Sequence, residues 1–427
     1  MAHPLEMEVF EGVYYKPRTG HGIVFGNPRT GKSKWIETRV ANDILDTENP
    51  KNVILVDPGP DPALFARVVW ATYEAVKKGA DKQLFVIGDF PKSLRIKPFY
   101  KMSPEEIADI IYDLTPESEK TTYFRDKAWE FAFIVSSALL SSGREVTFFD
   151  FIRFANKNEL NTLKVETQNY IKDPTAQVLL EQWANASEKR IEEDLSGMKS
   201  ALLKLTQGKA KQIFSGTVDP IREILMENPK DFTFTFYIGY SKKSEIEAKA
   251  IAKMILRSID KVIADMLERY EKFKHLLCVW VDECHNAIFK GFDDQLLLYG
   301  KSNTSFMLAT QTFANLDKID PSLNLRKNLL SATGLQVYFK ISELTTQQYV
   351  SRLSGTKIQY RKMLDSDEVR VIEEEVEVFK PEDIGRLRAG EFIAFIHGQP
   401  YKAFNDTSKY PQVKVRLPDG RTVSAMR

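Results

Sequence analysis

The chain has 427 residues, enough for two or three compact units with sizeable hydrophobic cores. Hydrophobic residues make up 43% of it and charged residues 28%, which is ordinary for a soluble globular protein. The formal net charge of +1 excludes a protein that is basic throughout, so a nucleic-acid site would have to be a local basic patch.

The first hundred residues alternate between apolar strands and a helical repeat. Apolar residues spaced four apart (Ile36, Val40 and Ile44) predict a helix over residues 34–45. Period-two alternation or short apolar runs predict strands at residues 7–15, 22–25, 53–56 and 84–87. Strands alternating with helices are typical of a parallel sheet with helices on its faces.

Residues 103–214 show helical periodicity and hardly any strand-like run. Ser103 followed by Glu106 is the pattern of a helix N-cap, and residues 128–140 and 175–186 are strong helix candidates. We therefore expect an all-helical insertion at residues 101–215.

The sheet pattern resumes after the insertion, with a long amphipathic helix at residues 244–270. Further strands are expected at residues 232–237, 276–281, 306–309 and 335–341. Residues 365–377 are expected to be a charged loop, and residues 391–403 a hairpin. The predicted fold is α/β with a central, mainly parallel sheet, divided into residues 1–100, 101–215, 216–355 and a small C-terminal extension at 356–427.

The turn after the second expected strand carries a phosphate-binding motif. Its residues fit G-x-x-x-x-G-K-[ST] and are Gly26, Asn27, Pro28, Arg29, Thr30, Gly31, Lys32 and Ser33. The glycines allow a tight turn whose N–H groups point at phosphates, and the N-terminus of the next helix adds positive potential. Lys32 would reach the β- and γ-phosphates, and Ser33 would offer its hydroxyl to Mg²⁺. The motif lies between a strand and a helix, as that chemistry requires.

The apolar run at residues 276–281 ends in two carboxylates, Asp282 and Glu283. At the carboxyl end of a strand, Asp282 can hold the Mg²⁺ shell and Glu283 can polarise the water that attacks the γ-phosphate. The alternative is an ordinary strand end with a solvated acidic turn, which the upstream phosphate motif disfavours. Cys284 and His285 are two adjacent residues without further ligands at metal spacing, so they do not indicate a metal site.

Three segments resemble the HerA–FtsK superfamily of ring motors, in particular the TraG/VirD4 coupling proteins and the VirB4 ATPases of conjugation and type IV secretion. They are Val53-Ile54-Leu55-Val56-Asp57-Pro58, Phe124-Arg125-Asp126-Lys127-Ala128-Trp129 and Ser305-Phe306-Met307-Leu308-Ala309-Thr310-Gln311. The resemblance covers roughly residues 20 to 355. It implies a RecA-like motor domain, a homo-hexameric ring that moves DNA through its centre, and Gln311 as the sensor of the γ-phosphate.

The sequence departs from that family at one expected site. Where coupling-type relatives often have an arginine that reaches into the neighbouring subunit, this chain has Gly300, followed by Lys301. Lys301, Arg326 and Arg352 are all candidates for this cation, and an arginine suits bidentate contact with phosphate better than a lysine does.

DNA-contacting residues are harder to predict. Near the end of the insertion lies a group of lysines that could follow a phosphate backbone, although such a run is more often a solvated helix face: Lys199, Lys204, Lys209 and Lys211.

Two cysteines without a CxxC pair indicate a reducing, cytoplasmic location. The sequence has neither a signal-peptide pattern nor a run of about 18 apolar residues, so work at the inner face of a membrane would need a separate membrane-anchored subunit.

These observations together predict an ATPase that binds ATP with Mg²⁺ and translocates DNA, with conjugative-type transfer, for import or export, as the leading interpretation. Two alternatives are a viral genome-packaging ATPase and a secretion or pilus-assembly ATPase that does not bind DNA. A subunit that binds nucleotide without turnover is disfavoured by Glu283, which such a protein would not need.

Overall fold

The structure is a computed structural model that describes residues 7–10, 13–15, 20–59, 61–88, 93–116, 122–226, 232–239, 245–289, 291–365, 368–407, 410–417 and 421–425. The chain divides into two compact units. The sheet unit comprises Met1–Phe85, Pro229–Ile238 and Ile263–Arg427, and the helical unit comprises Val86–Asn228 and Gly239–Val262. The fourfold division of the sequence given above stays a prediction.

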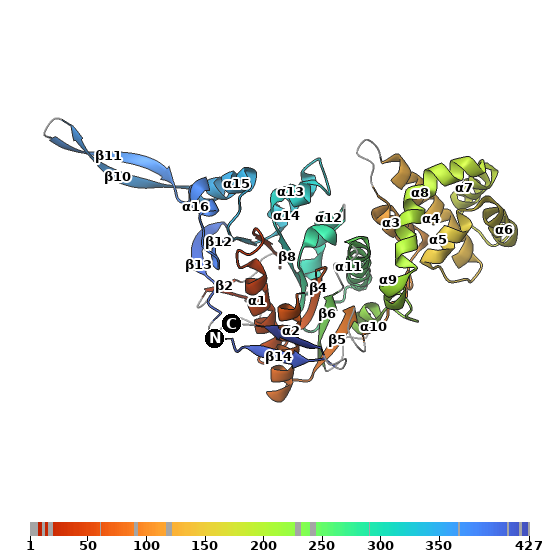
Figure 1. Ribbon diagram of the computed structural model, residues 1–427, viewed down its shortest axis with the longest axis horizontal. Coiled ribbons are helices and arrows are strands. Elements are labelled where there is room, and N and C mark those ends of the chain that lie inside the picture. The colour runs from red at the N-terminus through yellow and green to blue at the C-terminus, as the bar shows by residue number, and fades with distance from the viewer. Residues whose placement is uncertain are drawn as a thin grey trace. The chain divides into compact units, whose positions relative to one another are not determined.

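A nine-stranded sheet forms the centre of the sheet unit, in the order β13-β12-β9-β3-β8-β7-β4-β6-β5 (Figure 1). The pairs β9–β3, β3–β8, β8–β7 and β7–β4 are parallel, whereas β12 runs antiparallel to both β9 and β13. The strands are β3 (Gly22–Phe25), β4 (Asn52–Asp57), β5 (Lys82–Gly88), β6 (Thr233–Gly239), β7 (Leu277–Val281), β8 (Thr304–Thr310), β9 (Leu335–Tyr338), β12 (Glu391–Ile396) and β13 (Gln399–Phe404). The predicted α/β class with a mainly parallel sheet is confirmed.

Helices cover both faces of this sheet. In the paired strands β7 and β8, Trp280 lies opposite Met307 and Val279 opposite Phe306, so Trp280 and Phe306 point to opposite faces. Trp35 of α1 packs on Trp280, and Phe292 of α12 packs on Phe306. Burial on both faces explains why the central strands are continuous apolar runs.

The helices of the sheet unit are short apart from two. They are α1 (Lys32–Leu45), α2 (Pro62–Lys77), α12 (Phe292–Tyr299), α13 (Phe313–Asp317), α14 (Asn324–Ala332), α15 (Leu344–Ser354) and α16 (Pro381–Gly385), with 3-10 turns η1 (Cys284–Asn286) and η2 (Gly300–Ser302). A separate hairpin, β14 (Val413–Arg416) with β15 (Thr422–Ala425), packs on α2 through Ala66, Val413 and Ala425.

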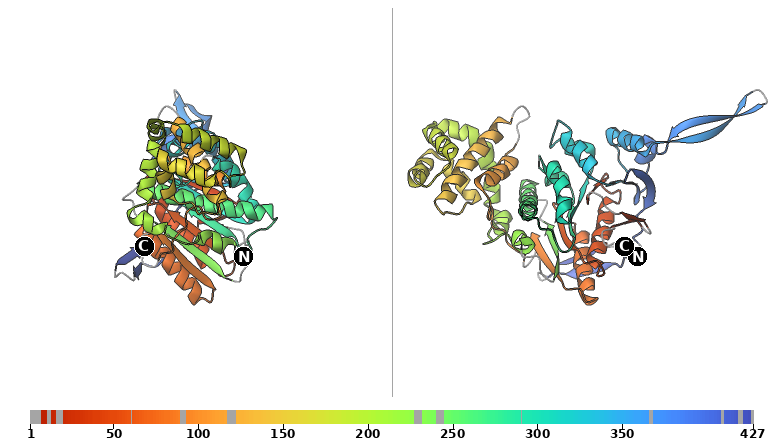
Figure 2. Two further views of the ribbon diagram at one scale, coloured as in Figure 1. Left: turned by 90° about the vertical axis from the view of Figure 1, so that its right-hand side faces the viewer. Right: turned by 180° about the vertical axis from the view of Figure 1, so that it is seen from behind.

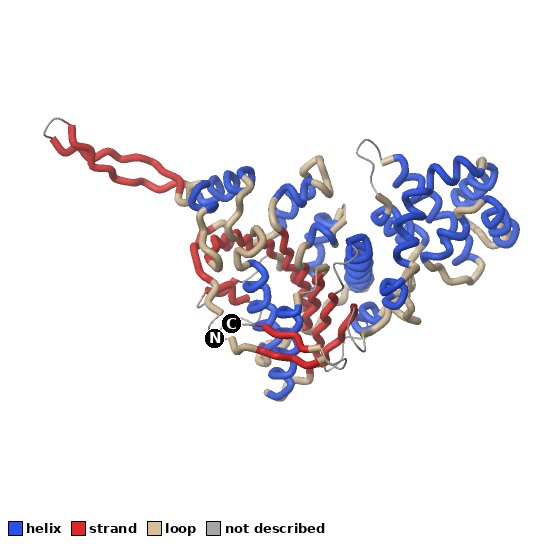
Figure 3. Tube along the Cα trace, viewed as in Figure 1, coloured by secondary structure: helices blue, strands red, loops and turns tan. Residues whose placement is uncertain are grey.

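The helical periodicity predicted for residues 103–214 is confirmed, and Figure 3 draws the described residues of this stretch, 103–116 and 122–214, as helices and loops. The helices of the helical unit are α3 (Pro104–Leu114), α4 (Tyr123–Ser141), α5 (Phe148–Phe154), α6 (Lys157–Thr167), α7 (Pro174–Asn185), α8 (Glu188–Leu205), α9 (Gly208–Ile213) and α10 (Pro220–Met226), and most of α11 (Glu245–Glu268) belongs to this unit. Ser103 and Glu106 form the predicted reciprocal N-cap of α3. None of the helices in the described part of the chain combines the length and apolar character that a membrane crossing needs.

Two secondary-structure predictions were wrong. The strand predicted at residues 7–15 is two antiparallel strands, β1 (Met7–Phe10) and β2 (Val13–Tyr15), since period-two alternation does not show that a chain reverses; residues 11–12 lie outside the described residues. The expected charged loop at 365–377 falls largely on a strand, since β10 (Thr356–Asp365) pairs with β11 (Glu368–Glu377); residues 366–367 lie outside the described residues. The many charged residues of this segment led to the prediction of a loop. A two-stranded ribbon, however, has no buried face from which charged residues are excluded. The hairpin at 391–403 is confirmed as β12–β13.

Candidate nucleotide-binding site

The predicted phosphate loop connects β3 to α1 and is tied to three other segments of the sheet unit. The Gly26 N–H donates to the Gln311 carbonyl (3.1 Å) and the Asn27 N–H to the Lys340 carbonyl (3.0 Å). The Gly390 N–H, just before β12, donates to the Thr30 carbonyl (2.8 Å). The loop therefore has a defined shape, set by the ends of β8, β9 and β12.

Gly31 is required by both conformation and space. Its φ is +106°, and a Cβ there would lie 2.8 Å from the Gly390 nitrogen. Gly31 is also the N-cap residue of α1, which has no side-chain cap and no acidic residue in its first turn. The first N–H groups of α1 therefore have no side-chain cap from Gly31, which is what a helix N-terminus that binds an anion requires.

Lys32, the first residue of α1, is buried and contacts both predicted carboxylates. Its Nζ lies 3.0 Å from Asp282 Oδ1 and 3.4 Å from Glu283 Oε1. Burial alone would lower the pKa of Lys32, but the two carboxylates outweigh it and raise the pKa above the ordinary lysine value. The ammonium is therefore kept charged in the nucleotide-free protein, at a place that phosphate oxygens would share.

Glu283 is held at the end of β7 in an unusual conformation. Its φ is +44°, and its N–H donates to Asp282 Oδ1 at 2.9 Å. Gln311, which follows β8, donates from Nε2 to both Glu283 carboxylate oxygens at 3.3 and 3.4 Å. Positive φ in a residue other than glycine is uncommon and clusters at functional sites. The structure thus brings Lys32, Asp282, Glu283 and Gln311 together.

Two residues of this site were not predicted from the sequence. His285 Nδ1 lies 3.1 Å from Thr310 Oγ1 and 3.5 Å from Glu283 Oε2, so it links the end of β8 to Glu283. Asn315 Nδ2 lies 3.4 Å from the other ring nitrogen of His285. The sequence carries no spacing signal for these contacts, because they depend on β7 and β8 being neighbours.

Asp57 ends β4, the neighbour of β7, and is almost fully buried. It accepts hydrogen bonds from the Tyr237 hydroxyl and the Asp61 N–H, both at 2.8 Å. Burial first, and then the charge of Asp282, raise the pKa of Asp57 to about 6. The carboxyl edge of the sheet therefore carries a second acidic group behind Asp282.

The acidic residues present do not make a metal site by themselves. In the described part of the chain no group of three or more His, Cys, Asp or Glu side chains is arranged to hold a metal ion. Ser33 is exposed at the start of α1, and Asp282 is nearly buried. Mg²⁺ keeps waters and shares its shell with phosphate oxygens, so this incomplete set fits an ion that arrives with a nucleotide.

The three candidates for a trans-acting cation differ in their surroundings. Arg326 Nη1 lies 2.7 Å from Asp317 Oδ2, and the guanidinium lies 4.8 Å from the Phe313 ring centroid. Arg352, in α15, is exposed. Lys301, in η2 just before β8, is exposed and lines a pocket of about 360 Å³ with Lys272, Phe273, Lys274, Gly300 and Asn303.

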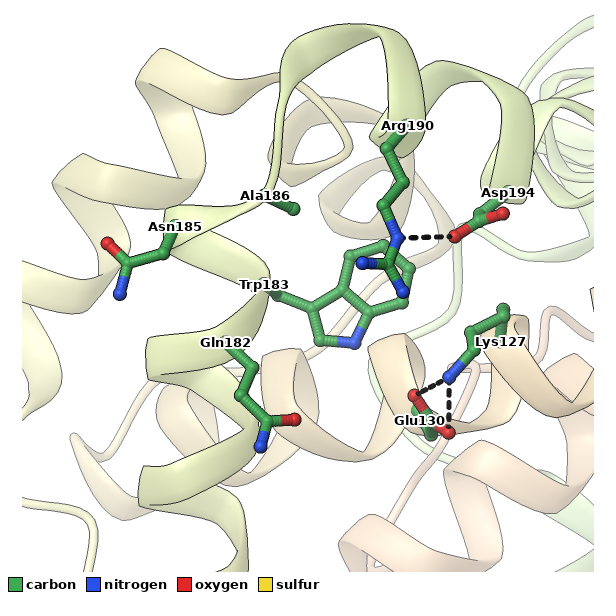
Figure 4. Close-up of a pocket in the computed structure, with 8 residues that line it drawn as sticks. All are labelled: Lys127, Glu130, Gln182, Trp183, Asn185, Ala186, Arg190 and Asp194. Carbon is green, nitrogen blue, oxygen red and sulfur yellow. Dashed lines mark hydrogen bonds and ion pairs between the residues drawn. The ribbon is translucent and has the colours of Figure 1, made fainter.

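The helical unit has a polar pocket of its own, of about 390 Å³. Figure 4 shows Trp183 between two ion pairs, Lys127–Glu130 (2.7 Å) and Arg190–Asp194 (3.5 Å). Each cation of the lining is matched by an acid, so the pocket lining has no net positive charge that would attract a phosphate backbone. Of the lysines singled out from the sequence, Lys204, Lys209 and Lys211 are exposed and Lys199 is half-buried.

Known proteins have a similar fold. Residues 275–388 match the family described as "TraM recognition site of TraD and TraG". The bacterial conjugative coupling protein TrwB, in an unbound form, has a TM-score of 0.70 at 15% identity, over 96% of this chain and 90% of that one. TrwB with the GTP analogue GDPNP has a TM-score of 0.66 at 16% identity, over 96% of this chain and 91% of that one. TrwB with ADP and Mg²⁺ has a TM-score of 0.63 at 14% identity, over 92% of this chain and 87% of that one. No curated protein matches the sequence.

These comparisons establish the fold. At such low identity a structural match shows architecture alone, and the architecture is the predicted RecA-like P-loop fold. The resemblance to the coupling proteins that was predicted from the sequence is confirmed, by the fold across the chain and by the family match over residues 275–388.

Proposed function

We propose that this chain is an ATPase that hydrolyses ATP with Mg²⁺ and uses the energy to move DNA in conjugation-type transfer. The observation that carries the proposal is the meeting of Lys32, Asp282, Glu283 and Gln311 beside the phosphate loop. The similar coupling protein TrwB has been solved with an ATP analogue and with ADP and Mg²⁺, which supports nucleotide and Mg²⁺ as ligands here.

ATP binding begins at the phosphate loop. The N–H groups of residues 26–33 and the N-terminus of α1 attract the phosphates, and Lys32 turns from its carboxylate partners toward the β- and γ-phosphate oxygens. Because its pKa is raised, Lys32 makes this move as a full cation. Ser33 and Asp282 would hold the Mg²⁺ that accompanies the nucleotide, and the ion would supply charge to stabilise the phosphate oxygens.

The departure of Lys32 frees Glu283 to act on water. Glu283 accepts a proton from a water molecule as the water oxygen bonds to the γ-phosphorus, and the bond from that phosphorus to the ADP oxygen breaks. Gln311 donates to the Glu283 carboxylate and follows β8, so it links the state of the γ-phosphate to that strand. His285, between Thr310 and Glu283, positions the same carboxylate.

A homo-hexameric ring would complete the site with a cation from the neighbouring subunit. Arg326 is already engaged by Asp317, which disfavours it. Lys301 is exposed beside Lys272 and Lys274, and we take it as the first candidate, with Arg352 as the second. Excess Lys301→Ala subunits mixed into the wild-type protein should lower hydrolysis per wild-type subunit, whereas Arg352→Ala subunits should not.

Steady-state ATP hydrolysis with and without duplex DNA tests the function. We expect stimulation by DNA, and a loss of about 10²- to 10⁴-fold in Glu283→Gln with nucleotide binding retained. Hydrolysis that ignores DNA would favour the secretion-type ATPase, and DNA stimulation with packaging into a capsid in place of transfer between cells would favour the viral one. No hydrolysis under any condition would contradict the proposal.

A further inference from the structure

The polar pocket of the helical unit lies between α4, α7 and α8. Helix α4 packs against both α7 and α8, and Figures 1 and 2 show these helices within one bundle. The pocket volume of about 390 Å³ falls within the range of small-molecule sites, roughly 300–1,000 Å³. All residues of the candidate nucleotide site belong to the sheet unit, so this pocket is not part of that site.

Asp194 of α8 is a buried acid that lines the pocket and has only distant partners. Its side chain is 8% exposed, and its Oδ2 lies 3.5 Å from Arg190 Nε. The Tyr123 hydroxyl donates to the same oxygen at 3.4 Å. Both partners come from exposed residues. A carboxylate can accept about four hydrogen bonds, and a buried one is stabilised by close donors, so Asp194 has the capacity to accept from a ligand in the pocket.

Trp183 of α7 offers the opposite kind of group, a hydrogen-bond donor. The residue is 6% exposed, and its ring packs edge-on against Phe131 with 5.4 Å between the centroids. Within the described part of the chain the indole N–H has no acceptor. Figure 4 shows the indole nitrogen pointing toward the part of the pocket where Gln182 and Glu130 lie. Because the N–H of a buried tryptophan usually has a partner, this donor favours a ligand that carries an acceptor.

The charges of the lining limit the net charge of such a ligand. Lys127 Nζ lies 2.7 Å from Glu130 Oε2, and Arg190 is the partner of Asp194, so the lining is neutral as a whole. A phosphate or a polyamine would bring a charge for which the pocket has no surplus partner. A ligand with one positive and one negative group keeps every charge matched, because each of its groups can face a side chain of opposite sign.

An α-amino acid has its two charged groups at a spacing that suits the Arg190–Asp194 pair. Its ammonium and carboxylate are bonded to the same carbon, and the two protein groups are 3.5 Å apart. The ligand carboxylate can accept from the guanidinium, whose planar fork matches it, while the ammonium donates to Asp194. The Arg190 side chain is 63% exposed and therefore free to adjust to the ligand.

The other side of the pocket selects the side chain of the ligand. Trp183 lies between the two ion pairs, with Lys127 and Glu130 on the side away from Arg190 (Figure 4). A side chain that reaches this region meets the indole donor and the Glu130 acceptor. A carboxamide or hydroxyl group can both accept from the first and donate to the second.

We propose that this pocket binds a free α-amino acid with a polar, uncharged side chain. Its carboxylate is held by Arg190, its ammonium by Asp194, and its side chain lies along Trp183. This site is separate from the nucleotide site and goes beyond the proposed function.

Isothermal titration calorimetry of the full chain with L-glutamine tests the proposal, and we expect saturable binding of one ligand per chain. Two derivatives each remove one charged group: N-acetyl-L-glutamine lacks the ammonium, and L-glutaminamide lacks the carboxylate. Each should bind about 10- to 100-fold more weakly than L-glutamine, since a hydrogen bond between charged groups is lost.

Two variants assign the two ends of the ligand. Arg190→Gln should bind L-glutamine no better than L-glutaminamide, and Asp194→Asn should bind L-glutamine no better than N-acetyl-L-glutamine. Lys189→Gln is the matched control, because it breaks the neighbouring Lys189–Glu193 pair of the same helix, which does not line the pocket. The control should bind like the wild type. Circular dichroism checks that each variant is folded, and the exposed Arg190 suffices for the test if Asp194→Asn is not.

Three results would overturn the proposal. The first is a wild type that shows no saturable binding of L-glutamine, L-asparagine, L-serine or L-threonine. The second is equal affinity for L-glutamine and its two derivatives, and the third is an Arg190→Gln protein that still prefers L-glutamine to L-glutaminamide. Binding is measured directly and without nucleotide, so these outcomes are independent of ATP hydrolysis.

Discussion

Replacing Lys32 by methionine should destabilise the nucleotide-free protein as well as abolish phosphate binding. The Lys32 side chain is 5% exposed and that of Asp282 11%, with 3.0 Å between Nζ and Oδ1. Methionine has a similar length and no charge, so it leaves the Asp282 carboxylate buried without its ion-pair partner. Removing one partner of such a pair costs about 3–5 kcal/mol. Glu283, with a side chain that is 28% exposed and 3.4 Å away, adds less than about 1 kcal/mol.

A double-mutant cycle isolates this ion pair. Lys32→Met combined with Asp282→Asn should recover most of the loss, because the second change removes the unpaired charge, with a coupling of about 2–3 kcal/mol. The raised pKa of Lys32 means that its stabilisation is fully present at all pH values below the ordinary lysine pKa and is lost only as the pH rises through the raised one. Measurements at neutral pH therefore report the whole effect.

Hydrogen-exchange mass spectrometry in increasing urea, without nucleotide, measures the free energy of opening of the peptides that contain β7 and β8. Peptides of α4 in the helical unit serve as the internal control and should not change. A Lys32→Met protein within about 1 kcal/mol of the wild type, or a double variant no more stable than the single one, would refute the buried ion pair as the ground state of this site.

Three further predictions follow from single residues. Gly31→Ala should cost about 1–3 kcal/mol and abolish nucleotide binding, since its φ is +106° and a Cβ would lie 2.8 Å from the Gly390 nitrogen; urea unfolding and ADP titration measure both, and unchanged ADP affinity would contradict the prediction. Burial lowers the pKa of Lys82 to about 8, so stability should rise between about pH 8 and 10; Lys82→Met, which removes the buried charge, should flatten that rise, and an unflattened profile would contradict it. Gln311→Ala should leave ATP affinity within a few-fold but uncouple DNA stimulation from hydrolysis, because its contact is with Glu283; an equally stimulated variant would refute the sensor role.

Residues that share one short motif could be predicted from the sequence. The phosphate loop at 26–33 and the acidic strand end at 282–283 are each contiguous, and each requires residue types whose chemistry is local. Gln311 was predicted only through the family resemblance, and its contact with Glu283 is now visible. His285 and Asp57 were not predicted as site residues, because their positions depend on which strands are neighbours.

The β10–β11 hairpin, in contrast, was not predicted from the sequence. Its dense charge predicted a loop, since charged residues are rare in sheets with a buried face. The backbone nevertheless pairs over ten residues in each strand, and residues 356–360 and 373–375 at the base of the ribbon are exposed. A high density of charged residues indicates that a segment is exposed to solvent. It does not show whether that segment is a loop or an exposed two-stranded ribbon.

The sequence by itself determined the class of fold, the helical character of residues 103–214 and the chemical groups of the candidate site, because periodicity and short motifs are local properties of the chain. Only the tertiary structure decided that Lys32 meets Asp282 across 250 positions of sequence, that Gly390 supports the phosphate loop, and that Gln311 reaches Glu283. Strand order is the physical reason: it follows from the packing of the whole sheet, and no local segment encodes which strands become neighbours.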